Sequence, residues 1–148
     1  MLMKNIRCIA IAWITHQDQI FVLEGYDPIK SSYFYRPIGG GIDFGETGLA
    51  AVLREFQEET QLALKNLEYL HTIENIFTYK GQTGHEMVCL YRADFVEDWI
   101  YQTPEITAYE DSGKSFRACW VNLSDFRSGQ KRLVPESLLA LMDPQTRR

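Results

Sequence analysis

The segment Gly39–Leu62 reads GGGIDFGETGLAAVLREFQEETQL and joins a glycine-rich stretch to the clearest predicted helix of the chain. That helix is expected over Gly48–Thr60, because its apolar residues recur at helical spacing and Thr47 directly before it is a good N-cap. The three glycines ahead of it let the backbone approach a ligand or a neighbouring segment closely, without obstruction by side chains. The segment therefore predicts an open loop that leads into a helix.

Three glutamates of this helix share one face. With Glu55 placed at zero and about 100° of rotation per residue, Glu59 falls at about 40° and Glu58 at about −60°. Like charges at this spacing destabilise an isolated helix, whereas hard carboxylate oxygens suit Mg²⁺ or Mn²⁺. The glutamates therefore indicate either a solvated acidic face or a divalent-metal site. The apolar residues form a separate face, between about 60° and 160°: Leu49, Val52, Leu53 and Phe56.

The rest of the chain reads mainly as β-structure. Strands are expected at 6–15, 19–24, 33–36, 67–79, 86–96 and 116–123. Loops are expected at 25–32 and at 80–84, and Trp99–Gly113 is interpreted as a long loop. A second helix, Glu136–Met142, follows Pro135, which is favourable in a first turn. Strands outnumber helices, so the fold class is α+β, with a mixed β-sheet sandwiched between α-helices in a single domain, 1–148.

The composition excludes several classes of protein. The net charge of −5 argues against bulk attraction of nucleic acid, which needs a basic face. No stretch reaches the roughly 20 apolar residues of a membrane span. Cys8, Cys89 and Cys119 are widely spaced and odd in number, so neither a disulfide framework nor a zinc site is indicated. A cytoplasmic protein without membrane contact is expected, and an anionic substrate would have to be held by something other than net charge, such as a bound metal.

The segment from Gly40 to Leu62 resembles the signature of the Nudix hydrolase family. That signature is a glycine, five residues, Glu, seven residues, Arg-Glu, a bulky aliphatic residue, any residue, Glu-Glu, any residue, Gly and an aliphatic residue. The chain departs from it at Phe56, which replaces the aliphatic residue, and at Gln61, which replaces the last glycine. Its matching residues are Gly40, Glu46, Arg54, Glu55, Glu58 and Glu59. The resemblance implies the Nudix fold, an α/β/α sandwich.

The resemblance also implies a metal site on the predicted helix. Glu58 and Glu59 would be the principal ligands of Mg²⁺, with Mn²⁺ as the alternative. Glu55 would either join them or accept a proton from the attacking water. The carbonyl of Gly39 is expected as a further ligand. The metal would polarise the diphosphate and lower the pKa of a bound water.

Other residues of the segment receive supporting roles from the resemblance. Arg54 would orient a catalytic carboxylate, since its planar fork suits bidentate pairing. Glu46 would support the loop. Arg36 and Gly40 are expected to contact the substrate, Arg36 through phosphate.

In this family the general base often lies outside the signature. Glu86, after the predicted hairpin loop, is the first candidate here and Glu74 the second, with His85 as a neighbour that could assist. Aromatic residues of the predicted strands would form either a base-stacking wall or part of the core: Tyr33, Phe34, Tyr35, Phe77 and Tyr79.

The implied reaction is the hydrolysis of a phosphoanhydride bond in a nucleoside diphosphate linked to another moiety. Nucleoside triphosphates, nucleotide sugars, ADP-ribose and dinucleoside polyphosphates remain alternative substrates, and a homodimer remains open. The rival function is a nucleotide sensor that binds without hydrolysis. A sensor has no need of the complete set of Arg54, Glu55, Glu58 and Glu59, so the enzyme is favoured.

Overall fold

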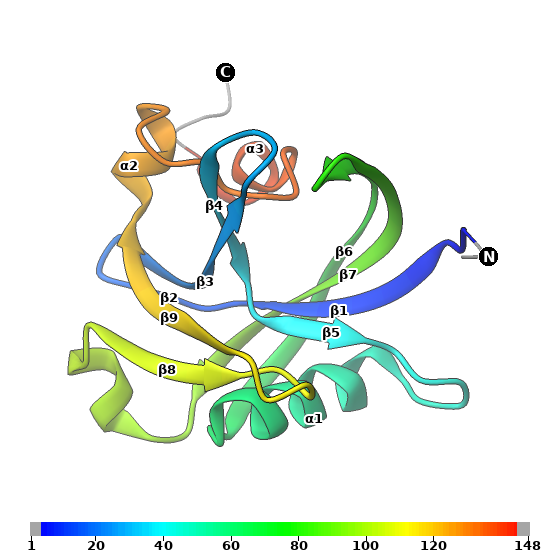
Figure 1. Ribbon diagram of the computed structural model, residues 1–148. Coiled ribbons are helices and arrows are strands. Elements are labelled where there is room, and N and C mark those ends of the chain that lie inside the picture. The colour runs from blue at the N-terminus through cyan, green and yellow to red at the C-terminus, as the bar shows by residue number, and fades with distance from the viewer. Residues whose placement is uncertain (1–3, 145–148) are drawn as a thin grey trace.

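The computed structural model describes residues 4–144, and their strands form two sheets (Figure 1). The first sheet has the order β5-β1-β7-β6 and the second β2-β3-β9-β8, with β4 paired to β3. The strands are β1 Arg7–Trp13, β2 Thr15–His16, β3 Gln19–Asp27, β4 Ser32–Pro37, β5 Gly39–Gly41, β6 Leu64–Tyr79, β7 Gln82–Phe95, β8 Glu105–Tyr109 and β9 Ser115–Asn122. The helices are α1 Gly48–Thr60, α2 Leu123–Arg127 and α3 Leu138–Met142, with a 3₁₀ helix η1 at Asp98–Gln102.

The two faces of β1 pack against different helices. Alternate residues of a strand point to opposite faces. Ala10 and Ala12 belong to the core that contains Phe56 of α1, whereas Ile9 and Ile11 belong to the core that α2 and α3 cover. Figure 1 shows α1 below the sheets and α2 and α3 above them. The predicted α+β class, with mixed β-structure between helices, is therefore confirmed, with the difference that the strands are divided between two sheets.

Helix α1 has the predicted bounds because both of its ends are determined locally. The hydroxyl of Thr47 accepts a hydrogen bond from the N–H of Ala50 at 3.1 Å, as an N-cap should. The helix ends at Gln61, whose backbone is left-handed with φ of 61°. The predicted apolar face was wrong at one position: Leu49 is 42% exposed, because it lies in the first turn, while Ala51 is fully buried in the core.

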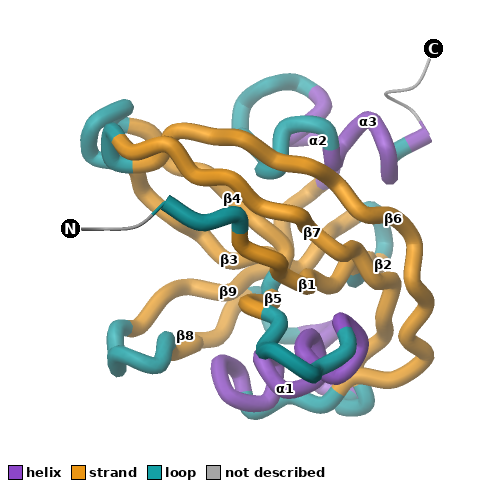
Figure 2. The backbone as a smooth tube through the Cα atoms, turned by 90° about the vertical axis from the view of Figure 1, so that its right-hand side faces the viewer, coloured by secondary structure: helices purple, strands orange, loops and turns teal. Residues whose placement is uncertain are grey.

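Strands β6 and β7 form a long hairpin, which Figure 2 shows as two tubes running side by side. Its turn is Lys80–Gly81, two residues that both have positive φ, 51° and 76°. Such two-residue turns match the twist of a hairpin. The expected loop at 80–84 was therefore too long, and strand pairing continues to Gln82.

Two predicted loops contain regular structure instead. The glycine-rich stretch forms β5, which pairs antiparallel with β1. The expected long loop, Trp99–Gly113, contains most of η1 and the whole of β8, and β8 pairs with β9. β5 consists of glycines and depends on β1, which is distant in sequence. β8 does alternate, with Ile106 and Ala108 turned inward, but it is only five residues long and forms as a hairpin with β9. Within residues 4–144, no helix is long and apolar enough to cross a membrane.

Asp27 joins the tips of two hairpins, one from each sheet. Its side chain is buried, with one carboxylate oxygen accepting from the N–H groups of Ile29 and Lys30 and the other from the N–H of Lys80 at 3.2 Å. The Lys30 ammonium also donates to the carbonyl of Thr78 at 2.7 Å. Burial raises the pKa of Asp27, but the three backbone hydrogen bonds outweigh it and the pKa is lowered. The carboxylate therefore links the β3–β4 turn to the β6–β7 turn.

Candidate functional site

Arg54 connects the loop before α1 to the carboxylates of the helix. Its Nε and Nη2 each donate to Glu46 at 2.8 Å, a bidentate pair. The Nη2 atom also donates to the carbonyl of Gly41 at 2.9 Å. The Nη1 atom donates to Glu55 at 2.9 Å and to Glu58 at 3.3 Å. One guanidinium thus positions β5, the loop and two of the predicted metal ligands.

Glu46 is held as a charged group inside the loop. One of its oxygens accepts from the backbone N–H of Asp43 at 3.1 Å, in addition to the pair with Arg54. The hydrogen bonds from Arg54 and from the Asp43 backbone lower the pKa of Glu46 to about 2. Its contacts all lie within the loop and Arg54, which is the arrangement expected of a supporting residue.

The glycine at position 40 allows Glu55 to approach the strand. A Cβ atom on Gly40 would lie 2.4 Å from the carboxylate carbon of Glu55, a distance that side-chain atoms do not tolerate. Gly40 does not line the cavity between the β3–β4 and β6–β7 hairpins. Its predicted contact with substrate stays a prediction.

The carbonyl of Gly39 points to the open edge of the first sheet. In an antiparallel ladder, alternate residues direct their backbone groups to the partner strand. The bonds from Ala12 N–H to the Ile38 carbonyl and from Ile42 N–H to the Cys8 carbonyl assign the even-numbered residues to β1. The carbonyls of Gly39 and Gly41 therefore face away from β1. The Gly41 carbonyl accepts a hydrogen bond from Arg54.

The charge of Glu59 is poorly compensated. Its Oε2 atom is buried and has no hydrogen-bond partner among the described residues. Burial and the neighbouring charge of Glu55 raise the pKa of Glu59 to about 8, against the opposing charge of Arg36. Asp111, in the turn between β8 and β9, contributes to the same increase.

These residues suit a bound cation. A divalent metal would supply the missing partner of the Glu59 oxygen and offset the repulsion between Glu55 and Glu59. Within residues 4–144, no three acidic, His or Cys side chains are already gathered as a complete metal site. Arg54 contacts Glu55 through Oε1 and Glu58 through Oε2, so the other oxygen of each carboxylate is not taken by the guanidinium.

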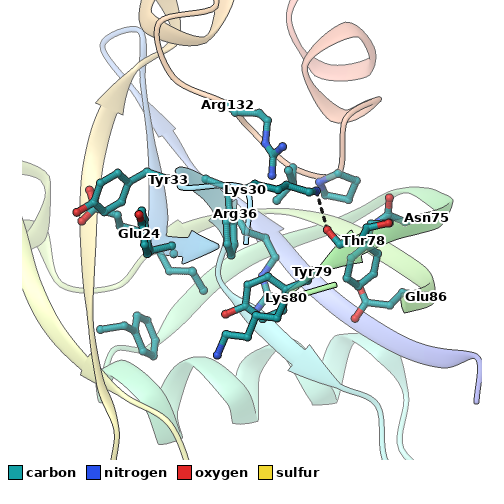
Figure 3. Close-up of a pocket in the computed structure, with 18 of the residues that line it drawn as sticks. Glu24, Lys30, Tyr33, Arg36, Asn75, Thr78, Tyr79, Lys80, Glu86 and Arg132 are labelled. Atoms are coloured by element: carbon teal, nitrogen blue, oxygen red, sulfur yellow. Dashed lines mark hydrogen bonds between the residues drawn. The ribbon is translucent and has the colours of Figure 1, made fainter. Parts of the chain in front are cut away.

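A cavity of about 880 Å³ lies between the β3–β4 and β6–β7 hairpins (Figure 3). Its aromatic lining consists of Tyr26, Tyr33, Phe34, Phe77, Tyr79 and Phe116. Of the five strand aromatics singled out in the sequence, four therefore line the cavity. The fifth, Tyr35, is buried in the core, and burial together with its hydrogen bond to Glu24 raises its pKa.

Arg36 lies between the cavity and the carboxylates of α1. It lines the cavity, and its charge acts on Glu59. The Nε atom of Arg36 is buried without a hydrogen-bond partner in the described part of the chain. A buried donor without a partner is costly, so this position is suited to an anionic group of a ligand.

The two candidates for the general base lie in different places. Glu86 is buried, lines the cavity and has Arg7 as its nearest charged neighbour, at 4.0 Å. Glu74 is exposed and contacts His85 at 3.3 Å, and neither residue lines the cavity. Of the two, Glu86 therefore has access to a ligand in the cavity.

Sequence reasoning missed three residues of this region. Arg7 faces Glu86 because β1 and β7 pair in parallel with these two residues in register. Arg132 enters the cavity from the segment before α3, and Asp111 approaches Glu59 from the β8–β9 turn. Each is placed by contacts between distant segments, and no local pattern marks any of them.

Comparisons with known proteins identify the family and the fold of the chain. The family model described as NUDIX domain matches residues 5–142. The fold is similar to a MutT NUDIX hydrolase from Burkholderia pseudomallei, with a TM-score of 0.60 and 21% identity over 82% of this chain and 86% of that chain. A NUDIX hydrolase from Nitrosomonas europaea gives a TM-score of 0.59 and 17% identity over 85% of this chain and 78% of that chain.

A solved structure titled as an ADP compounds hydrolase has a TM-score of 0.56 and 17% identity, covering 84% of this chain and 63% of that chain. None of the curated proteins matches the chain significantly in sequence. At these identities the solved structures establish the fold, and the family model establishes the family.

Proposed function

Because the chain belongs to the Nudix family, we propose that it is a divalent-metal-dependent hydrolase of a phosphoanhydride bond in a nucleoside diphosphate linked to another moiety. The observation that carries the proposal is the environment of Glu59. A carboxylate oxygen is buried there without a partner, beside Glu55 and next to an arginine that lines a large cavity. A metal bound to a diphosphate would satisfy the carboxylates and the arginine together.

Glu58 and Glu59 would hold Mg²⁺, or Mn²⁺ in its place, with the Gly39 carbonyl as a further ligand and Glu55 either as a third carboxylate ligand or as the base. When bound, the metal supplies charge neutralisation at the diphosphate and lowers the pKa of a coordinated water. Arg36 binds a phosphate oxygen through its unpartnered Nε.

Arg54 acts as a positioning residue, since it contacts Glu46, Glu55 and Glu58 and does not line the cavity. It holds the Glu55 carboxylate against Gly40, so that this group is oriented before substrate arrives. A lysine at this position would retain the charge and lose the fork that contacts several acceptors at once.

Glu55 is the base we favour, because it adjoins Glu59. The Glu55 carboxylate would accept a proton from the attacking water as the water oxygen forms its bond to phosphorus. The bond from that phosphorus to the bridging oxygen breaks, and the bridging oxygen leaves with the second phosphoryl group. Glu86 is the alternative base on the cavity wall.

The test is a hydrolysis assay with purified protein. Nucleoside triphosphates, nucleotide sugars, ADP-ribose and dinucleoside polyphosphates are each incubated with Mg²⁺ or with EDTA, and the products are separated and quantified. The variants are Glu58→Gln, Glu55→Gln, Glu86→Gln and Arg54→Lys. Glu97→Gln is the matched control, because Glu97 is an exposed glutamate outside the cavity and before η1.

We expect Mg²⁺-dependent turnover that falls by roughly 100-fold or more in Glu58→Gln and is unchanged in Glu97→Gln. A larger loss in Glu55→Gln than in Glu86→Gln identifies the base. Arg54→Lys should lower kcat with little change in KM. Absence of turnover on every substrate, combined with tight nucleotide binding, would refute the hydrolase and support the sensor.

A further inference from the structure

A second group of cations lies at the part of the cavity opposite α1. Arg132 lines the cavity, and its Nε atom is buried and lacks a hydrogen-bond partner among residues 4–144. The nearest carboxylate is that of Glu136, 3.7 Å from this Nε, on a side chain that is 72% exposed. A partly buried guanidinium with one distant, solvated counter-ion has capacity for another anion.

The backbone places Arg132 on the same surface as Arg36. Tyr35 of β4 forms a parallel bridge with Leu133, in which the Tyr35 N–H donates to the Arg132 carbonyl at 2.9 Å. Tyr35 and Leu133 are both buried in the core, so their neighbours point the other way, into the cavity. Arg132 therefore lies beside Phe34, about 7 Å along the strand from the level of Arg36.

The cavity is positively charged, although the protein is not. Four carboxylates line it, and two of these are paired: Glu24 with Arg117 and Glu86 with Arg7. Figure 3 shows Arg132 above the cavity and α1 below it, and Lys30, whose ammonium donates to the Thr78 carbonyl, also lines the cavity. The cationic residues of the lining number six: Arg7, Lys30, Arg36, Lys80, Lys114 and Arg132.

Aromatic rings line the same cavity as the two arginines. Phe34 stands next to Arg132 and contacts Tyr79 edge to face, with ring centroids 5.6 Å apart. A flat nucleobase or sugar ring can pack against these side chains. A ligand lying along the cavity would thus present its diphosphate to Arg36 and to a metal held by the α1 carboxylates, a ring to the aromatic residues, and its other end to Arg132.

We propose that Arg132, assisted by Lys30, forms a second anion subsite that binds a phosphate group carried on the part of the substrate remote from the scissile bond. This inference rests on the proposed function, which places the scissile diphosphate between Arg36 and α1. The substrate class is a nucleotide conjugate whose nucleoside carries an additional phosphomonoester. A nucleoside with free hydroxyls would leave Arg132 without its anion.

The experiment measures binding by isothermal titration calorimetry in Mg²⁺ buffer. The probes are AMP and GMP, each compared with the matching nucleoside 2′,5′- and 3′,5′-bisphosphates. The proteins are the wild type, Arg132→Gln and Glu136→Gln, with Arg92→Gln as the control, because Arg92 is an exposed arginine outside this cavity. Circular dichroism and melting temperature confirm that each variant is folded.

In the wild type, at least one bisphosphate should bind about tenfold more tightly than its monophosphate. Arg132→Gln should abolish that preference and leave the affinity for the monophosphate unchanged. Glu136→Gln removes the carboxylate that competes for Arg132, so it should strengthen the preference, which a purely structural role of Arg132 would not produce. Arg92→Gln should match the wild type.

The inference is overturned if neither bisphosphate is preferred, if the preference survives in Arg132→Gln, or if none of the nucleotides binds. These probes contain no anhydride bond, so their binding does not depend on turnover. Hydrolysis without a bisphosphate preference would refute the subsite alone. A bisphosphate preference without hydrolysis of any conjugate would refute the proposed enzyme and retain the subsite.

Discussion

At the scale of single residues, Arg54 and Glu59 differ in how many hydrogen-bond partners their charged groups have. All three guanidinium nitrogens of Arg54 donate hydrogen bonds, to Glu46, Glu55, Glu58 and the Gly41 carbonyl. Glu59 is left with a buried oxygen that has no hydrogen-bond partner within residues 4–144. The first residue makes the site rigid, and the second makes its stability depend on pH and on metal.

Glu59→Gln should remove a pH dependence of stability in metal-free buffer. The pKa of Glu59 is about 8 in the folded chain, above its ordinary value of 4.5. Between these values the folded state holds a proton that the unfolded state has lost, so stability decreases as pH rises from about 4.5 to 8. The neutral amide in Glu59→Gln avoids this loss, and the variant should exceed the wild type by on the order of 1–3 kcal/mol at pH 8.

Urea unfolding at pH 4, 6 and 8 in EDTA measures this difference, which should be near zero at pH 4. Glu97→Gln changes an exposed side chain, so the difference in the free energy of unfolding between this variant and the wild type should be the same at every pH. Added Mg²⁺ should stabilise the wild type at pH 8 and have little effect on Glu59→Gln. If the free energy of unfolding changed with pH in the same way in the wild type and in Glu59→Gln, Glu59 would not be the buried, unpartnered carboxylate with the raised pKa.

The residues of the site were predictable to the extent that one segment supplies them. Spacing along a helix places Glu55, Glu58 and Glu59 on one face. The Arg7–Glu86 pair and the position of Arg132 could not be predicted, because they depend on the register between β1 and β7 and on the bridge from Tyr35 to Leu133. Such registers are set by packing of the whole chain.

At the scale of elements, α1 ends in a residue with an unfavourable backbone conformation. Gln61 has φ of 61°, where a side chain clashes with the backbone and glycine does not. Gln61→Gly should therefore raise the free energy of unfolding by about 0.5–1 kcal/mol, after allowance for the greater freedom of glycine in the unfolded chain. Chemical denaturation at constant pH measures the change.

Gln57→Gly is the matched control, because it makes the same substitution at an exposed position inside the same helix. There the substitution should destabilise the protein by about 1 kcal/mol. Opposite signs for the two variants would support the left-handed end of α1. Destabilisation by both variants would show that the helix continues beyond Gln61.

The elements differ in how far their own sequence determines them. Helix α1 was predicted with its exact bounds, since Thr47 and the apolar spacing are local signals. Strands β5 and β8 were not predicted. β5 consists of three glycines, which have little preference for a strand, and it forms because β1 offers backbone groups along its edge. β8 likewise depends on β9.

At the scale of the whole molecule, Asp27 should be among the most sensitive positions outside the site. Asp27→Ala leaves three backbone N–H groups without their acceptor and separates the two hairpin tips. We expect a loss of about 3 kcal/mol in the free energy of unfolding and faster hydrogen exchange at the Lys80 amide. Asp94→Ala, at an exposed residue that accepts one hydrogen bond from Asn66, should cost less than about 1 kcal/mol.

Urea unfolding with hydrogen exchange measured by NMR separates these outcomes. Because the pKa of Asp27 is lowered, its contribution should be present above about pH 4 and decline as the pH falls further. An unchanged exchange rate at Lys80 in Asp27→Ala would show that the tips are held together without the carboxylate.

The proposed catalytic groups lie on α1 and the cavity walls lie on the hairpins, and this separation has a consequence for how such a protein can evolve. The groups around Arg54 are bound to one another, so a mutation in one of them disturbs the others and is removed by selection. The cavity walls stand on β3, β4 and β6, outside the Arg54 cluster. Mutations there can alter which substrate is bound while the catalytic groups stay the same. Proteins descended from one ancestor can therefore diverge in substrate specificity and keep the same reaction.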